Sequence, residues 1–113
     1  MTRWLLLALA ACDPAPVTID QHPCPATGTP MTYDNFGSVF FASYCDRCHS
    51  ATIGDRHGAP GSYVFDTLDD VRAHADRIFV RAAGPNTTMP PGPDDPPLDD
   101  RDKLADWLAC GSP

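Results

Sequence analysis

Apolar residues recur at helical spacing in three stretches of the chain, residues 32–44, 67–83 and 99–109. Within each stretch they lie three or four positions apart, so that one face of a helix would carry them. These residues are Phe36, Val39, Phe40, Tyr44, Leu68, Val71, Ala75, Ile78, Phe79, Ala82, Leu104, Trp107 and Leu108. Alternating strand-like runs are almost absent, and the sequence therefore predicts a small all-α fold of three to four helices.

The ends of two predicted helices carry start and stop signals. Asp66 or Thr67 can cap the middle helix, and Gly84, which is followed by proline, ends it. Asp99 is the expected N-cap of the last helix, and Gly111 stops that helix.

Gly37 lies in the middle of the first predicted helix, where glycine costs about 1 kcal/mol relative to alanine. We therefore expect Gly37 to permit the close approach of another element, and the last helix is the expected partner. Trp107 is predicted to pack over Gly37 and Phe41.

The first eleven residues hold one cation, Arg3, and an apolar run that is too short to span a bilayer. We interpret residues 1–11 as an export signal. The run ends in Leu9-Ala10-Ala11-Cys12, which resembles the lipobox of bacterial lipoproteins and implies that Cys12 is lipidated. The chain is then expected on the periplasmic side of a membrane or on the cell surface, held by a lipid anchor.

Residues 12–30 contain repeated prolines and few large apolar residues, which is typical of an extended tether. Residues 31–113 remain as one small domain. At that size a hydrophobic core alone is marginal, and cofactors or disulfides usually contribute to stability.

The formal net charge is −7 at pH 7. Nucleic acid is therefore an unsuitable partner, because binding phosphates requires a basic face. The acidity is compatible with a merely solvated surface or with partners that offer a basic docking patch.

Cys45-Asp46-Arg47-Cys48-His49 is the most informative motif of the chain. Two cysteines separated by two residues and followed by histidine are typical of covalent haem attachment. One helical turn can offer both thiols to the two vinyl groups of a haem while His49 reaches the iron. The sequence thus predicts one covalently bound haem c.

Two other sites remain open for Cys45 and Cys48. A structural zinc site would require a second close pair of ligands, and none follows downstream. A redox dithiol of the thioredoxin type would require a βαβ pattern, which the chain does not show.

Cys24 and Cys110 are left over if Cys12 is lipidated and Cys45 and Cys48 hold haem. In an exported protein the two could form a disulfide. The alternative is two unrelated thiols.

The chain resembles the small bacterial class I monohaem cytochromes c. Besides the haem motif, the matching residues are Gly37, Phe41, Pro60, Thr88-Met89-Pro90-Pro91 and Trp107-Leu108. The resemblance covers residues 31–111 and implies a cytochrome c-like fold around the haem. It further implies that His49 is the proximal axial iron ligand and Met89 the distal one.

The same resemblance implies that the Pro60 carbonyl accepts a hydrogen bond from the His49 ring, a role that Ala59 or Gly61 could take instead. Arg56 and His57 could neutralise a haem propionate. His22, His57 and His74 are weaker candidates for the distal ligand.

Ligation by His and Met leaves no open iron position, so the expected function is electron transfer by a monomeric carrier with protein redox partners, not enzymatic catalysis. The alternatives are a haem enzyme or a gas sensor with a labile Met89. A lipid-tethered structural protein with zinc or a disulfide at Cys45 and Cys48 is a further alternative.

Overall fold

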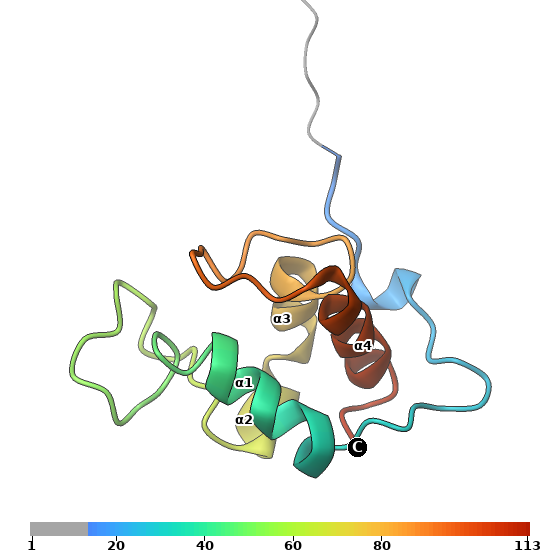
Figure 1. Ribbon diagram of the computed structural model, residues 1–113, viewed down its shortest axis with the longest axis horizontal. Helices are drawn as coiled ribbons and strands as arrows, with labels where there is room; N and C mark the ends of the chain where they lie inside the picture. The colour runs from blue at the N-terminus through green and yellow to red at the C-terminus, as the bar shows by residue number, and fades with distance from the viewer. Residues whose placement is uncertain (1–13) are drawn as a thin grey trace, which may run out of the picture.

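The computed structural model describes residues 14–113, and their regular elements are all helical (Figure 1). They are the short turns η1 (Ile19–Gln21) and η2 (Tyr33–Gly37) and the helices α1 (Ser38–Tyr44), α2 (Leu68–Ala73), α3 (Ala75–Ala82) and α4 (Leu98–Ala109). The predicted all-α class is confirmed for these residues. The export signal and Cys12 lie outside the described part. Within it, no helix combines the length and the apolar character that crossing a bilayer requires.

The first predicted helix forms as one continuous rod of η2 and α1. Thr32 caps it, because its hydroxyl accepts from the Asn35 N–H at 3.2 Å while Asn35 Oδ1 accepts from the Thr32 N–H at 2.7 Å. The first turn is a π-helix, which sequence spacing did not indicate. A Cβ at Gly37 would lie 2.8 Å from Trp107 Cζ2, so the predicted close approach of Trp107 is confirmed.

The middle stretch divides into α2 and α3, and the prediction of one helix over residues 67–83 is wrong. Thr67 caps α2 through a reciprocal pair of hydrogen bonds with Asp70. At His74 the backbone leaves helical geometry, with φ −115° and ψ 15°. The ring Nδ1 of His74 lies 2.9 Å from the Asp70 carbonyl, an acceptor that would serve the His74 N–H in a continuous helix.

The last helix begins one residue earlier than predicted. Pro97 is the N-cap of α4 and Leu98 its first residue, so Asp99 lies in the first turn and is not the cap. There its negative charge faces the positive end of the helix dipole. After α4, Gly111 adopts a φ of +89°, and its N–H and that of Ser112 donate to the carbonyls of Leu108 and Trp107.

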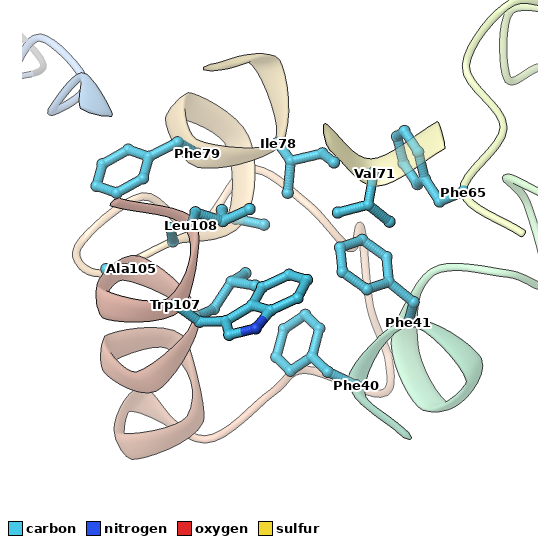
Figure 2. Packing of buried hydrophobic residues seen from close by; sticks show 12 residues of the cluster. Phe40, Phe41, Phe65, Val71, Ile78, Phe79, Ala105, Trp107 and Leu108 are labelled. Carbon is cyan, nitrogen blue, oxygen red and sulfur yellow. The ribbon is translucent and has the colours of Figure 1, made fainter. Parts of the chain in front are cut away.

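The core lies where α1, α3 and α4 meet, and Trp107 occupies its centre (Figure 2). Trp107 is fully buried, and its ring centroid lies 6.3 Å from those of both Phe36 and Phe41. Phe41 in turn packs edge-on against Phe65, at 5.8 Å. Aromatic residues from three segments thus fix the position of α1 relative to α4.

Residues 17–31, which we name the N-terminal strap, pack on the helices. The prediction of an extended tether over all of residues 12–30 is therefore wrong. Val17 exchanges two hydrogen bonds with the side chain of Asn86, at 2.9 and 2.7 Å. The apolar residues that pack against the core are Val17, Ile19 and Met31. The prolines predict extended backbone in this segment, but an extended segment can still pack against the hydrophobic core.

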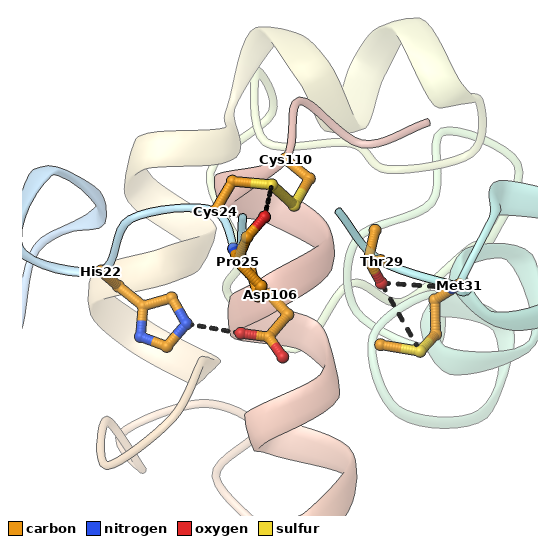
Figure 3. Close-up of polar contacts among 7 residues, drawn as sticks. All are labelled: His22, Cys24, Pro25, Thr29, Met31, Asp106 and Cys110. Carbon is orange, nitrogen blue, oxygen red and sulfur yellow. Dashed lines mark hydrogen bonds and ion pairs between the residues drawn. A yellow bond between two sulfur atoms is a disulfide. The ribbon is translucent and has the colours of Figure 1, made fainter. Parts of the chain in front are cut away.

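A hydrogen bond and a disulfide join the strap to α4 and its C-terminal end (Figure 3). His22 Nε2 lies 2.8 Å from Asp106 Oδ1, and Cys24 forms a disulfide with Cys110 at the end of the helix. The disulfide closes a loop with a sequence separation of 86 residues.

Candidate cofactor site

One cavity of about 320 Å³ brings together all five residues that the sequence predicts for the cofactor. They are Cys45, Cys48, His49, Pro60 and Met89. The walls come from α1, the segment of residues 45–65 that follows it, α3, and residues 83–97 between α3 and α4, which we name the Met89 loop. These segments are far apart in sequence, so the cavity is a product of the tertiary fold.

The turn after α1 presents Cys45, Cys48 and His49 together. The Cys45 N–H continues the helix by donating to the Phe41 carbonyl at 2.9 Å. The Cys45 carbonyl then accepts from the N–H groups of both Cys48, at 3.1 Å, and His49, at 3.0 Å. One tight turn thus directs both thiols and the imidazole into the same cavity. Neither thiol is part of a disulfide.

The imidazole of His49 is oriented by Tyr63. Its Nδ1 lies 2.8 Å from the Tyr63 carbonyl, and its ring stacks on Phe65 with centroids 4.6 Å apart. When Nδ1 donates to that carbonyl, Nε2 is the nitrogen that is free to bind a metal.

The predicted hydrogen bond from His49 to the Pro60 carbonyl is therefore wrong, and so are the alternatives Ala59 and Gly61. The Pro60 carbonyl accepts from the Tyr63 N–H at 3.0 Å in a turn of the chain, and this turn places the Tyr63 carbonyl against the ring instead. Pro60 itself lines the cavity. No residue pattern marks Tyr63 as this partner, because the contact depends on how the segment turns.

Met89 reaches the cavity from the Met89 loop, and its side chain is partly exposed, at 37%. Its N–H donates to the Arg81 carbonyl at 2.8 Å, and the Thr88 hydroxyl donates to the same carbonyl at 3.3 Å. The loop is thereby joined to the last turn of α3.

The lining of the cavity combines apolar surface with positive charge. Phe41, Ile78 and Pro91 are among the apolar residues of the lining. The lining also contains the two cysteines, His49 and two tyrosines, and its remaining charged or titratable side chains are Arg47, His57, Arg77 and Arg81. No carboxylate is among the described residues that line it. A largely apolar molecule that carries negative groups would suit this surface, and a haem with its two propionates is such a molecule.

Arg56 and the other histidines take different places. Arg56 Nη2 donates to the Tyr63 carbonyl at 2.8 Å, so this arginine braces the carbonyl that orients His49. His22 contacts Asp106, and His74 contacts the Asp70 carbonyl, as described above. Of the alternative distal ligands, only His57 lines the cavity.

Burial raises the pKa values of two residues of the motif, Cys45 and Asp46. Burial, reinforced by the neighbouring Asp46 carboxylate, raises the pKa of the Cys45 thiol to about 12. A reactive redox dithiol requires the opposite, a thiol whose pKa lies below its ordinary value. An uncharged thioether avoids the cost of burying a thiolate at this position. Burial, and then the charge of Asp66, raise the pKa of Asp46 to about 6.

Within residues 14–113, no three side chains of His, Cys, Asp or Glu form a group that could hold a metal ion. Comparison of the chain with known protein families, characterised proteins and solved structures gives no match.

Proposed function

We propose that this protein is a c-type cytochrome with one covalently bound haem, and that it carries electrons. The observation that supports the proposal most strongly is the convergence of Cys45, Cys48, His49 and Met89 on one cavity. These four residues would provide two thioether attachments and two iron ligands, and they come from different halves of the domain sequence, residues 45–49 and residue 89. The apolar and cationic lining fits the ring and the propionates.

Each residue has a definite role in this proposal. When bound, haem c supplies an iron that alternates between the ferrous and ferric states. Cys45 and Cys48 hold the ring covalently, and His49 binds the iron through Nε2, since Nδ1 is occupied by the Tyr63 carbonyl. Met89 provides a soft thioether donor, which favours ferrous iron and raises the reduction potential. The cationic side chains at the cavity can neutralise the propionates.

Ligation on both sides favours an electron carrier over an enzyme or a gas sensor. An enzyme or a sensor requires an open or readily vacated iron position, whereas Met89 would fill it. Redox proteins are the proposed partners, and the net charge of −7 favours partners with a basic docking patch.

We also propose that the protein is exported and anchored by lipid at Cys12. The disulfide between Cys24 and Cys110 supports the export, because such bonds persist in oxidising compartments. Replacement of Cys12 by Ser should move the protein from the membrane fraction to the soluble fraction. Continued membrane association of that variant would refute the lipid anchor.

The experiment that tests the haem proposal uses protein produced with a haem-attachment system. A pyridine haemochrome spectrum should show one haem c per chain, and the oxidised protein should show the weak red-region band of sulfur-to-iron ligation. Met89→Ala should abolish this band and lower the potential. Protein without haem would refute the proposal, and an unchanged band in Met89→Ala would refute Met89 as the ligand.

Addition of carbon monoxide to the reduced protein separates the alternative functions. Slow or negligible binding is expected for a carrier, because Met89 occupies the iron. Rapid binding by the wild-type protein would instead favour the enzyme or the sensor, with His57 as the other histidine besides His49 among the described residues that line the cavity.

A further inference from the structure

Arg101 is a buried cation on α4, with only 3% of its surface exposed. A guanidinium stays charged in proteins, and burying it costs free energy unless hydrogen bonds or an opposite charge compensate. Among residues 14–113 no carboxylate forms an ion pair with Arg101. No sequence pattern marks this residue, because a lone arginine in a charged helix resembles an exposed one.

Three backbone carbonyls compensate the buried charge. Nη1 of Arg101 donates to the carbonyls of Ala82 at 2.9 Å, Asn86 at 3.1 Å and Met89 at 2.8 Å. Ala82 ends α3, and the other two residues belong to the Met89 loop. The side chain of Arg101 therefore links α4 to the end of α3 and to the Met89 loop, which carries the candidate ligand.

The backbone of Met89 is consequently fixed on both sides. Its N–H donates to the Arg81 carbonyl at 2.8 Å, and its own carbonyl accepts from Arg101. These two bonds link the backbone of Met89 to α3 and α4, while its side chain can vary through its own rotamers.

We propose that Arg101 is a positioning residue that keeps Met89 directed into the cavity. This inference rests on the proposed ligation of iron by His49 and Met89. A thioether is a weak ligand, so its occupancy depends on how well the protein holds it in place before it binds. Nη1 carries two hydrogens for the three carbonyls of Ala82, Asn86 and Met89, so one hydrogen is shared between two of them.

The test compares Arg101→Met with the wild-type protein, both loaded with haem. The substitution preserves much of the apolar stem and removes every donor. The red-region band should weaken, and carbon monoxide should bind the reduced protein about ten-fold faster or more, as expected when a charge-assisted hydrogen bond is lost. The amide of Met89 should also exchange its hydrogen faster.

Arg72→Met is the matched control. Arg72 likewise donates to a backbone carbonyl, that of Ser112, through Nε at 3.2 Å and Nη2 at 2.9 Å, but this carbonyl lies at the end of the chain and not in the Met89 loop. This variant should lose some stability and keep both the band and the rate of carbon monoxide binding within about two-fold.

Three outcomes overturn the inference. One is a folded Arg101→Met variant whose band and rate match those of the control. If Arg101→Met does not fold, Arg101→Gln takes its place, and an unchanged rate in that variant has the same meaning. In the wild-type protein, exchange of the Met89 amide as fast as that of exposed Gly54 would also overturn it. A wild-type protein that binds haem but lacks the band would instead refute the proposed function.

Discussion

His49 and Met89 reach the same cavity from segments that are anchored in different ways. His49 lies in a turn that continues α1, and its N–H donates to the Cys45 carbonyl at 3.0 Å. Met89 lies in a loop whose backbone bonds lead to Arg81 on α3 and Arg101 on α4. A local helical bond holds the backbone N–H of His49, and Tyr63 orients its ring, whereas both backbone bonds of Met89 lead to other helices. We therefore expect perturbations of the tertiary structure to release Met89 before they affect His49.

The largest effect should come from the thiols beside His49. Replacing both Cys45 and Cys48 by Ser removes covalent attachment, so that no haem should remain on the denatured chain. Haem staining of a denaturing gel measures this. The double variant Cys24→Ser with Cys110→Ser is the matched control, since it removes the same number of sulfur atoms outside the cavity. It should keep its haem, and a stained band in the first variant would contradict the proposed attachment.

The next largest effect concerns the disulfide between the N-terminal strap and α4. Its loss in Cys24→Ser with Cys110→Ser should reduce the free energy of unfolding by about 2–4 kcal/mol, because the unfolded chain is no longer constrained. Urea denaturation of the haem-loaded protein measures the change. The red-region band should persist without denaturant and disappear at a lower urea concentration than the spectral signature of His49 ligation, since the covalently held haem itself still absorbs in the unfolded chain. Loss of both signals at the same urea concentration would contradict the expectation that Met89 is released before His49.

The elements that sequence reasoning predicted well depend on local signals. Apolar periodicity identified the first and last helices, and a glycine within a helix indicated the contact with Trp107. Each of these inferences needs only a few neighbouring residues. The break at His74 was missed because apolar spacing continues through it, while a side-chain contact with the Asp70 carbonyl decides the local geometry.

In the candidate site, too, local signals predicted some residues, while others depend on contacts between distant segments. The motif at Cys45 specifies its own turn, so the sequence alone predicted the three side chains that this turn brings to the cavity. The partner of the His49 ring, Tyr63, and the support of Met89, Arg101, depend on where loops place backbone carbonyls. Backbone carbonyls are present at every residue, and no residue type marks the one that is used.

A smaller effect is expected at Gly37, on the helix that carries the motif. In Gly37→Ala the new Cβ would lie 2.8 Å from Trp107 Cζ2 and 3.0 Å from Tyr33 Cδ2. Overpacking should outweigh the gain in helix propensity and reduce the free energy of unfolding by about 1–2 kcal/mol. Gly54→Ala is the control, because no atom lies within 4 Å of its added Cβ, and it should change stability by less than about 0.5 kcal/mol.

The Gly37 substitution also examines how α1 transmits strain to the cavity. The Tyr63 carbonyl is held by its own turn and by Arg56, away from the contact between Gly37 and Trp107, so its hydrogen bond with His49 should survive. NMR detection of the Nδ1 proton of His49 checks this. Loss of that proton signal in a folded Gly37→Ala variant would contradict the local anchoring of the turn.

The smallest effect concerns pH and the segment that follows His49. Hydrogen bonds from the Ser50 side chain and the Ala51 N–H lower the pKa of Asp66 below its ordinary value of 3.8. Since the folded-state pKa is depressed, this stabilisation is present above pH 3.8 and is lost as the pH falls through the folded-state value. Asp46 acts in the opposite direction at higher pH: its raised pKa, about 6, gives a gain in stability as the pH falls toward 4.

Asp66→Asn separates these two contributions. The variant should lose the decline in stability below about pH 4, because the amide does not titrate there, and it should keep a weaker rise between pH 6 and 4. Urea denaturation at closely spaced pH values measures both. In the wild-type protein, acid should reduce the protection of the Ala51 amide, measured as its exchange rate relative to an unprotected amide at the same pH. The protection of the Met89 amide should stay unchanged, since no carboxylate contacts the backbone bonds of Met89 among the described residues. Equal loss of protection at both amides would show that the two sides of the cavity respond to acid as one unit.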